Sequence, residues 1–441
     1  MRIGLIAMSG VRAVDPELMR AGLTLPGFVE RIRVIASLPS LGLLTLAGMT
    51  PPVHEIAYHE ARDLAEAANI PVDFDLVAIS SFSAQIRQAY ALADRLRASG
   101  VRVVLGGPHV SVLPDEAGAH ADAVVIGEGE LSWPDVLADA QRGALQPRYG
   151  ERGKAFDLTT APMPRFDLLD PARYNRIPIQ TSRGCPHRCE FCASTPLMTA
   201  GYRQKTPRQV LAEIDAVRER WPHPFIEFAD DNSFVDRAWW KALLVELIPR
   251  QVRWFTECDL SVAEDPALLD LLYRSGCAQV LIGLESPVAT GLGGIELRGD
   301  WKLKRFDRYR AAIARIQAHG VSVNGCFILG LDGHGPDIFA AVEQFVATSG
   351  LAEVQITVQT PFPGTVLHER LAKAGRLLDP GNWDLCTLFD VAFTPTHMSV
   401  DELRTGFRAL IARLYSDANV ASRRATFRAA RRSGRERTLP T

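Results

Sequence analysis

The chain has 441 residues, of which 47% are hydrophobic and 23% are charged, a length and composition that predict a globular protein of two or three domains. Its 49 basic and 51 acidic side chains leave a net charge of −2, so no overall positive field favours nucleic acid as a partner. No stretch approaches the roughly eighteen uninterrupted apolar residues of a membrane span, and we therefore expect none.

The first 145 residues alternate between short apolar strands and helices. This pattern predicts a doubly wound parallel sheet, whose ligands bind beyond the carboxyl ends of the strands. The expected strands are Arg2–Met8, His54–Tyr58, Asp75–Ser81, Val101–Leu105 and Ala123–Ile126. The expected helices are Pro39–Met49, Ala61–Ala68 and Gln85–Ser99.

Small residues stand at the carboxyl ends of three of these strands. They are Ser80, Ser81, Gly106, Gly107 and Gly127. Glycine at such a position lets backbone amides come close to a large flat ligand, so we expect a ligand site there. His109 follows two of the glycines and is interpreted as a loop-packing residue rather than as a ligand.

Residues 146–176 contain four prolines and few apolar runs, and they are predicted to form a linker. Shortly after it, Cys185, Cys189 and Cys192 stand at C-x3-C-x2-C spacing. Three thiolates on one loop can hold three irons of a [4Fe–4S] cluster and leave the fourth iron open. The alternative is a zinc site, but zinc needs a fourth ligand, which His187 could supply only with strain.

With Phe191 placed just before its third cysteine, the motif resembles the signature of the radical S-adenosylmethionine (SAM) enzymes. In that family the open iron binds the amino and carboxylate groups of SAM, and an electron from the cluster cleaves the sulfonium to give a 5′-deoxyadenosyl radical. The resemblance implies that the three cysteines are the cluster ligands and that Phe191 lies near the adenine.

A second alternation of strands and helices follows the predicted linker and includes the cysteine loop. The expected strands are Pro178–Thr181, Phe225–Ala229, Arg253–Glu257, Gln279–Leu284, Ser322–Leu329 and Glu353–Thr360. The expected helices are Pro207–Glu219, Arg237–Ile248, Pro266–Arg274, Lys304–Ala318, Pro336–Ala347 and Thr365–Ala374. Six such units suggest that residues 177–375 form the partial (β/α)6 barrel of the resembled family, with its site at the carboxyl ends of the strands.

Two of these strand ends carry acidic residues that match places where the family binds SAM. Asp230 is predicted to contact the SAM ammonium, with Asp231 as the alternate, because a carboxylate pairs well with a cation. Asp231 could instead begin the next helix as its N-cap. Glu285 and Ser286 resemble the family's G-x-E-S and are predicted to contact the ribose and carboxylate of SAM.

The following strand ends match the family less closely. Cys326 stands where the family's G-x-I-x-G has its first glycine, and residues 361–364 resemble its P-x-P-G loop. Cys258 and Cys326 are candidate catalytic thiols or radical donors, whereas Cys277 and Cys386 are interpreted as packing residues. Glu257 and Asp259, which flank Cys258, could bind substrate or could simply face solvent.

The first domain resembles the cobalamin-binding domain that is fused to many radical SAM enzymes, most clearly at residues 105–109 and 125–130. It lacks the D-x-H-x-x-G that supplies a histidine ligand to cobalt in other cobalamin proteins. The resemblance implies cobalamin bound without such a histidine. The alternative is a cobalamin-like fold that has lost its ligand.

Residues 376–441, with an amphipathic helix expected at Val400–Tyr415, resemble the tail that follows the barrel in cobalamin-dependent members of the family. The resemblance implies a small helical region that caps the open side of the barrel. Its end is rich in arginine. Such a run could bind an acidic partner, but it is more often a solvated helix end and a frayed terminus.

Taken together, these patterns and resemblances predict a cytoplasmic, oxygen-sensitive, cobalamin-dependent radical SAM enzyme. A methyltransferase acting on an unactivated carbon is the favoured function, with a small molecule or a peptide as substrate and flavodoxin or ferredoxin as electron donor. The alternatives are a radical cyclase or rearrangement enzyme that transfers no methyl group, and a non-catalytic iron–sulfur or cobalamin sensor.

Overall fold

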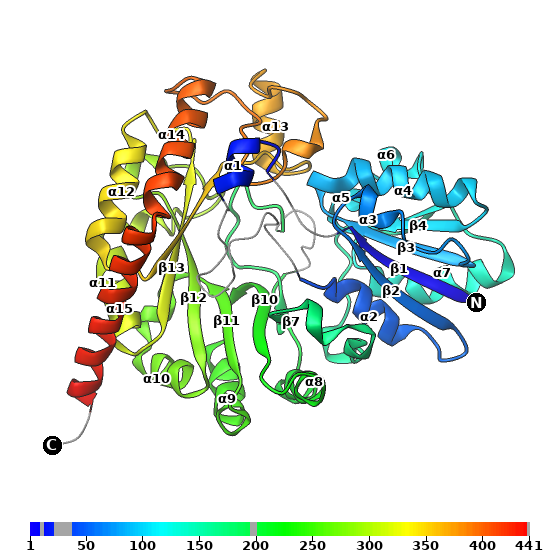
Figure 1. Ribbon diagram of the computed structural model, residues 1–441, viewed down its shortest axis with the longest axis horizontal. Helices are drawn as coiled ribbons and strands as arrows, with labels where there is room; N and C mark the ends of the chain where they lie inside the picture. The colour runs from blue at the N-terminus through cyan, green and yellow to red at the C-terminus, as the bar shows by residue number, and fades with distance from the viewer. Residues whose placement is uncertain (9–12, 22–37, 195–200, 439–441) are drawn as a thin grey trace.

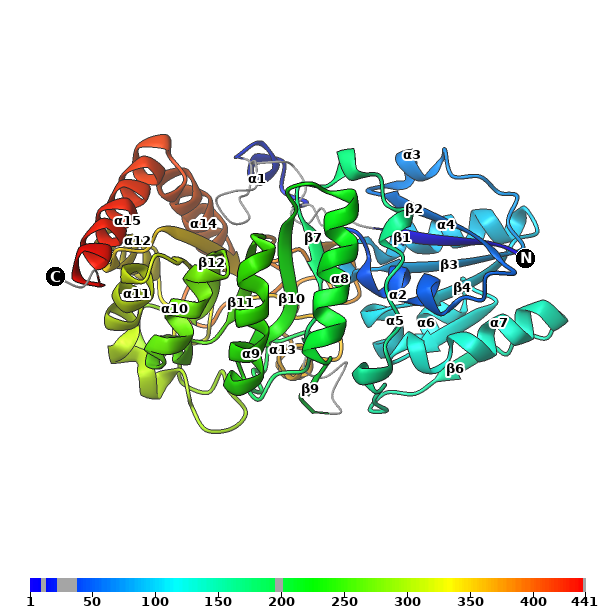
Figure 2. The ribbon, with the colours of Figure 1, turned by 90° about the horizontal axis from the view of Figure 1, so that it is seen from below.

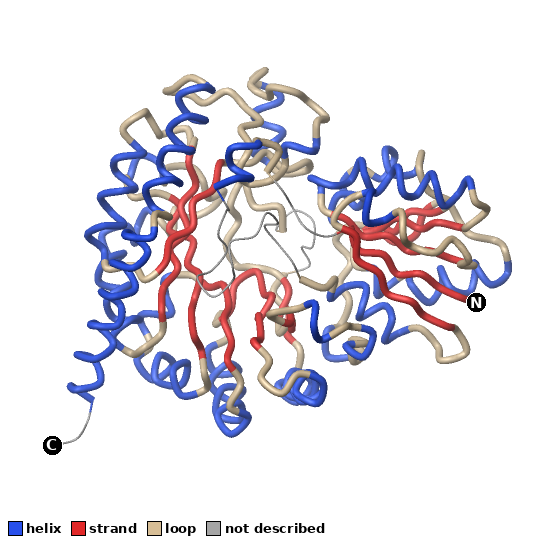
Figure 3. The backbone as a smooth tube through the Cα atoms, viewed as in Figure 1, coloured by secondary structure: helices blue, strands red, loops and turns tan. Residues whose placement is uncertain are grey.

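The computed structural model describes residues 1–8, 13–21, 38–194 and 201–438. It contains two parallel sheets, each covered by helices and lying beside the other (Figures 1 and 3). The chain therefore has the two α/β units that the sequence predicts, followed by a helical C-terminal region.

The first sheet has the strand order β2-β1-β3-β4-β5-β6, and every neighbouring pair is parallel. Its strands are β1 (Arg2–Met8), β2 (Glu55–Ala61), β3 (Leu76–Ser81), β4 (Arg102–Gly106), β5 (Ala123–Ile126) and β6 (Arg148–Gly150). Strand β1 starts at the outer end of the domain and runs toward the barrel (Figure 1). The carboxyl ends of this parallel sheet therefore face the second domain.

Helices cover both faces of this sheet. Successive side chains of a strand point to opposite sides, so both sets of side chains are buried. In β1, Ile3 and Leu5 pack against α2 (Leu41–Met49) and α7 (Trp133–Arg142). Ile6 and Met8 pack on the other face, with α4 (Ile86–Ala98). The short helices α3 (Leu64–Ala67), α5 (Pro108–Val112) and α6 (Pro114–Gly118) complete the domain.

The second sheet has the order β14-β13-β12-β11-β10-β7 and is also parallel throughout. Its strands are β7 (Ile177–Ile179), β10 (Phe225–Ser233), β11 (Arg253–Cys258), β12 (Cys277–Glu285), β13 (Ser322–Leu329) and β14 (Glu353–Val358). The helices are α8 (Pro207–Arg220), α9 (Arg237–Leu247), α10 (Pro266–Arg274), α11 (Tyr309–Ala318), α12 (Ile338–Ser349) and α13 (Val366–Lys373). Helices α8 to α12 line the outside of the curved sheet (Figures 1 and 2), as a partial barrel requires.

The chain departs from the prediction at two elements. Strand β6 lies in the stretch predicted to be a linker, yet it pairs with β5 as the edge of the first sheet. The arginine-rich end forms α15 (Asp417–Thr438), which continues beyond α14 (Val400–Leu414) on the side of the barrel away from the first domain (Figure 1). Arg423 is buried there and donates to the Leu414 carbonyl at 2.8 Å, so part of the run is structural.

The N-terminal segment crosses from the first domain to the barrel. Helix α1 (Pro16–Ala21) lies beside α14, above the barrel strands (Figure 1). The buried carboxylate of Asp390 accepts hydrogen bonds from the backbone amides of Val14, at 2.8 Å, and Asp15, at 3.0 Å. The Asp15 side chain is in turn paired with Arg408 of α14.

The C-terminal region also touches the first domain. The indole of Trp383 donates to Glu116 at 3.1 Å, and Arg87 donates to the Gly381 carbonyl at 2.9 Å. This region therefore bridges the two domains in addition to covering the barrel. Within the described residues, no helix has both the length and the apolar character needed to cross a bilayer.

Candidate active site

A cavity of about 380 Å³ lies at the carboxyl ends of the barrel strands. Its wall includes Cys185, Cys189, Cys192 and Phe191 from the loop that follows β7, the first strand of the barrel. His187 and Ala193 of the same loop also line it, and the other lining residues come from strands β10 to β14, the loops that follow them and, at Leu388, the C-terminal region. The structure thus places all three predicted cluster ligands and Phe191 on one cavity.

The cysteine loop is held by the barrel at both ends. The amide of Gly184 donates to Asp231 at 2.8 Å, and the amide of Glu190 donates to the Ile295 carbonyl at 2.9 Å. Gly184 has φ +93°, and a Cβ on it would lie 2.6 Å from the Gly201 carbonyl oxygen. Only glycine fits this turn, which brings the chain into the site just before Cys185.

The donor set of the cavity fits an iron–sulfur cluster. Burial raises the pKa of Cys185 to about 11 and that of Cys189 further, and metal binding would displace these protons. Among the described residues no three Cys, His, Asp or Glu side chains already stand at metal-binding separation. The fit therefore rests on three thiols from one loop that share a cavity.

Asp230, the residue predicted to contact the SAM ammonium, does not line the cavity. Its buried carboxylate accepts hydrogen bonds from the amides of Thr181 and Ser182, at 2.7 and 3.0 Å, and from the hydroxyls of Thr181 and Ser233. Asp231, the alternate, lines the cavity. Neighbouring residues of a strand point to opposite faces, so only one of the two acids can face the interior of the barrel.

Glu285 lines the cavity, as predicted, but its carboxylate already has a partner. Lys302 donates to Glu285 at 2.8 Å and to the Gly283 carbonyl at 2.7 Å. Burial alone would lower the pKa of Lys302, but the charges of Glu285 and Cys189 outweigh it, and that pKa is raised. Sequence reasoning missed Lys302, a buried cation beside the cluster loop, because nothing in its local pattern distinguishes it from a surface lysine.

Ser286, in contrast to Glu285, does not line the cavity. It is fully buried, its hydroxyl donates to the Val288 carbonyl at 2.8 Å, and it lies 2.9 Å from Nε2 of His334. Glu285, the preceding residue, has φ +63°. The strand ends at this turn, so Ser286 points away from the site and fixes the loop that follows.

Cys258, Cys326 and Glu257 all line the cavity, whereas Cys277 and Cys386 are buried elsewhere, as predicted for packing residues. Glu257 has an exposed side chain, but the surface that it meets is the interior of the barrel rather than bulk solvent. Enclosure by protein and the charges of Glu227 and Asp231 therefore raise its pKa to about 7.

Asp259 also lines the cavity but is committed to other protein groups. It accepts from Nε2 of His187 at 3.1 Å and from the side-chain Nδ2 of Asn232 at 3.0 Å. Burial alone would raise its pKa, but these hydrogen bonds lower it. His187 is thus oriented by a carboxylate on the wall of the cavity.

A second, smaller pocket lies at the carboxyl edge of the first sheet. Ser80, Gly106, Gly107 and Gly127 line it together with apolar residues of α2. Ser81, the fifth predicted residue, does not, and its hydroxyl donates to the Phe82 carbonyl. Four of the five residues that we predict for cobalamin therefore surround one pocket.

The glycines of this pocket differ in what a side chain would meet. A Cβ on Gly106 would have no neighbour closer than 3.8 Å, so a side chain there would fill the pocket. Gly107 has φ +105°, and Gly127 has φ +81° with the Glu151 carbonyl 2.5 Å from an added Cβ. This bare backbone fits a large ligand. No histidine is among the described residues that line the pocket.

His109 is a packing residue, as expected. It is buried, with Nδ1 3.0 Å from the Ser83 hydroxyl and Nε2 3.3 Å from Glu116. Its ring lies edge-on to Trp383 at 5.3 Å.

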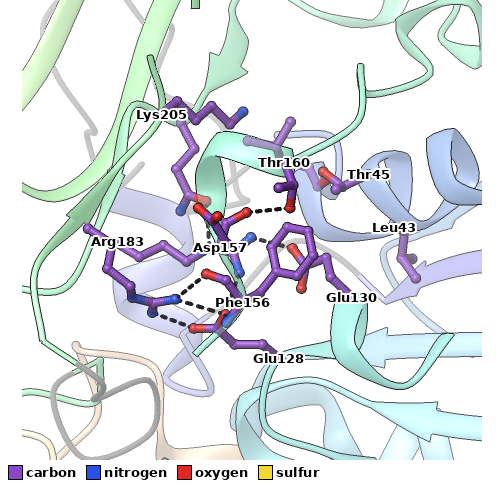
Figure 4. A network of polar contacts seen from close by, with 12 residues as sticks. Leu43, Thr45, Glu128, Glu130, Phe156, Asp157, Thr160, Arg183 and Lys205 are labelled. Carbon is purple, nitrogen blue, oxygen red and sulfur yellow. Dashed lines mark hydrogen bonds and ion pairs between the residues drawn. The ribbon is translucent and has the colours of Figure 1, made fainter. Parts of the chain in front are cut away.

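A network of buried charges joins this pocket to the cysteine loop (Figure 4). Glu128 and Glu130 extend from the end of β5, where Glu130 also lines the pocket. Arg183, two residues before Cys185, is paired with both, at 3.3 Å from Glu128. Arg203 pairs with Glu128 at 2.5 Å and donates to the Phe156 carbonyl at 2.8 Å.

Two family models match this chain over the two domains. The radical SAM superfamily model matches residues 179–346, and the B12 binding domain model matches residues 34–137. An uncharacterized methyltransferase of Synechocystis sp. is 30% identical over 377 residues, which cover 81% of this chain and 67% of that protein. The chain belongs to the cobalamin-binding radical SAM enzymes.

Other similarities agree with this membership. A third model, for a domain of unknown function, matches residues 365–439 of this radical SAM enzyme. The bacteriochlorophyllide d C-12(1)-methyltransferase of Chlorobaculum tepidum is 28% identical over 392 residues, which cover 87% of this chain and 84% of that enzyme. The structure of the radical SAM methyltransferase TsrM from Kitasatospora setae, with cobalamin and a [4Fe–4S] cluster bound, covers 99% of each chain with a TM-score of 0.68 and 15% identity.

The family membership defines the cofactors of this radical SAM enzyme. They are a [4Fe–4S] cluster, SAM and cobalamin. The zinc interpretation of the cysteines is therefore set aside. The fold agreement with TsrM extends over both domains and the C-terminal region.

Proposed function

We propose that this enzyme transfers a methyl group to an unactivated carbon of a small organic substrate. The observation that carries the proposal is the direct link between its two pockets, because Arg183 of the cluster loop is paired with Glu130 of the first pocket. When bound, the cluster and SAM supply a radical that removes a hydrogen atom, and cobalamin supplies the methyl group. The two sequence relatives reported above are both named as methyltransferases.

The cavity residues suggest how SAM is held. We infer that Phe191 packs near the adenine, and that Asp231, rather than Asp230, contacts the ammonium, since Asp231 is the acid that faces the cavity. Glu285 remains the proposed ribose contact. Lys302 fixes its carboxylate at 2.8 Å and so orients it before any ligand arrives.

The remainder of the cavity would bind the substrate. Apolar side chains form much of its wall: Leu281, Ile328, Val358, Phe362 and Leu388. Glu257, Gln355 and Gln359 supply polar groups in the same cavity. This lining suits a largely apolar molecule with a polar group that fixes its orientation. Cys258 and Cys326 remain candidates for a hydrogen-donating thiol, because burial raises the pKa of both and keeps them protonated.

We further propose that flavodoxin or ferredoxin supplies the electrons and that the enzyme works in the cytoplasm. Its seven cysteines comprise the three of the cluster motif and four that stand singly in the sequence. This usage suits a reducing compartment, in which an iron–sulfur cluster survives.

The test is the stoichiometry of SAM consumption in the anaerobic, reconstituted enzyme. With the true substrate, a methyl transfer would use two molecules of SAM, so S-adenosylhomocysteine and 5′-deoxyadenosine should form in equal amounts, with labelled methyl in the product. 5′-Deoxyadenosine without S-adenosylhomocysteine would favour a cyclase or a rearrangement enzyme. A protein with a full cluster that forms no 5′-deoxyadenosine would be a sensor instead.

A further inference from the structure

A third space, which we call the outer hollow, lies on the side of the cluster loop opposite the active-site cavity. It has a volume of about 630 Å³, and Pro186 and His187, between the first two cysteines, are part of its wall. His187 and Asp259 line both this hollow and the active-site cavity. These two hydrogen-bonded side chains therefore form a wall that the two spaces share, and the hollow reaches the cluster loop from outside.

This outer hollow is strongly basic. Its cationic residues are Arg237, Arg298, Lys304 and Arg305, against the single acid Asp259, which is committed to His187 and Asn232. Within the part of the chain that the structure describes, no salt bridge is formed by Arg237, Arg298 or Lys304. The chain as a whole has a net charge of −2, so the positive charge is a property of this surface.

Acids are present at the edge of the hollow but do not neutralise it. Glu264 is 3.7 Å from Arg305, whose guanidinium also lies 4.2 Å above the ring of Trp301. Asp236 caps helix α9 by accepting from the Trp239 amide. The cations Arg298 and Lys304 remain exposed.

The loop that carries these cations is bonded to the cluster loop. Cys189 and Glu296 form an antiparallel bridge, and the Leu297 amide donates to the Arg188 carbonyl at 2.8 Å. Arg298 thus follows two residues after the partner of a cluster cysteine, and Arg188 is itself an exposed cation. A molecule bound by these charges would lie against the backbone that holds the cluster.

We propose that this basic hollow is the docking surface for an acidic one-electron carrier protein of the flavodoxin or ferredoxin class. The inference rests on the proposed function, in which each turnover needs an electron at the cluster while SAM and substrate occupy the inner cavity. Complementary charge would steer an acidic carrier to this face. The exposed Val235 and the half-buried Trp301 add apolar contact area of the kind that protein interfaces contain.

The electron count is balanced. The carrier is oxidised by one electron and the cluster is reduced by one. That electron then passes to the sulfonium of SAM, whose C5′–S bond breaks to give methionine and the 5′-deoxyadenosyl radical. The radical becomes 5′-deoxyadenosine by taking one hydrogen atom.

The test compares two double variants of the reconstituted enzyme that carry the same change of charge. Arg298→Glu/Lys304→Glu alters the hollow. Arg428→Glu/Arg431→Glu alters exposed residues of α15. This helix passes Glu353, to which Arg424 is paired, at the amino end of β14. Its charges therefore lie at the end of the barrel away from the cluster loop. Affinity for a reduced bacterial flavodoxin is measured by calorimetry at low and at physiological salt. 5′-Deoxyadenosine formation without substrate is measured with flavodoxin or with dithionite as reductant.

We expect the hollow variant to bind flavodoxin about tenfold more weakly or worse, with a smaller salt dependence, and to lose flavodoxin-driven 5′-deoxyadenosine formation in proportion. Dithionite-driven formation and the α15 variant should match the wild type. Unchanged binding in the hollow variant, or an equal loss in the α15 variant, would overturn the proposal. If a full cluster gives no 5′-deoxyadenosine with dithionite, the proposed function fails, and the binding measurement still decides whether the carrier docks here.

Discussion

The chemistry of the site depends first on three thiols from one short loop. Cys189→Ala should remove a ligand that no other cysteine can replace, so iron content and cluster absorption should fall sharply after anaerobic reconstitution. Cys258 and Cys326 line the same cavity, but strand pairing with Ile282 and Gly283 fixes their backbones. Cys386→Ala, at a buried cysteine outside the cavity, is the control and should keep a full cluster.

Glu257 should make stability depend on pH. Its pKa is raised from 4.5 to about 7, so between these values the folded protein holds a proton that the unfolded chain releases. The free energy of unfolding should therefore fall as the pH rises through this range. Urea unfolding from about pH 5 to about pH 8 should show a smaller fall for Glu257→Gln than for the wild type. The control Glu219→Gln, at an exposed residue, should leave the pH dependence of the free energy of unfolding unchanged. A Glu257→Gln variant with the same pH dependence as the wild type would contradict the raised pKa of Glu257.

At this scale the sequence locates functional residues along the chain more reliably than it orients them. The cysteines, Phe191 and Glu285 all line the cavity as predicted. Of the pair at residues 230 and 231, the structure places Asp231 rather than the favoured Asp230 on the cavity wall, because the strand face that is inward depends on how β10 packs between β7 and β11. Lys302 is 17 residues from its partner Glu285, and no local pattern encodes that contact.

At the scale of single elements, the strand ends of the first sheet decide whether cobalamin can bind. Gly106→Val should place a branched side chain in the pocket without a strained backbone, since an added Cβ has no neighbour closer than 3.8 Å. We expect cobalamin retention, measured by absorption after gel filtration, to fall at least about tenfold while the iron content stays normal. Gly118→Val is the matched control, because an added Cβ there meets nothing within 4 Å. Full retention in Gly106→Val would place cobalamin elsewhere.

Elements with an apolar run were predictable, even the four-residue strand Ala123–Ile126, whereas strand β6 and helix α15 were not. Ser322–Leu329 and Pro266–Arg274 have the predicted bounds, since each is a run with a clear apolar period. Strand β6 has three residues, too few for any period. Helix α15 is rich in arginine and lacks an apolar stripe, and its first turns are held by contacts such as Arg423 with the Leu414 carbonyl.

At the scale of the whole molecule, the buried charges between the domains should contribute strongly to stability. Arg183→Gln leaves the carboxylate of Glu130 buried without its cation, which we expect to cost about 3–5 kcal/mol in the free energy of unfolding. Arg165→Gln breaks an exposed pair with Asp167 and should cost about 1 kcal/mol or less. Adding Glu130→Gln to Arg183→Gln should restore much of the loss. Equal costs for the two arginines in urea unfolding would contradict this.

The path of the first residues has a consequence for how far the two domains can be treated as modules. The chain leaves β1, its Val14 and Asp15 amides donate to Asp390 of the C-terminal region, and it returns to the first domain at α2. A barrel and C-terminal region expressed without residues 1–21 would leave the buried carboxylate of Asp390 without the two backbone amides that donate to it. The two cofactor domains are thus joined by this N-terminal contact as well as by the chain between them. A different cobalamin domain grafted onto this barrel would have to bring equivalents of Val14 and Asp15 with it.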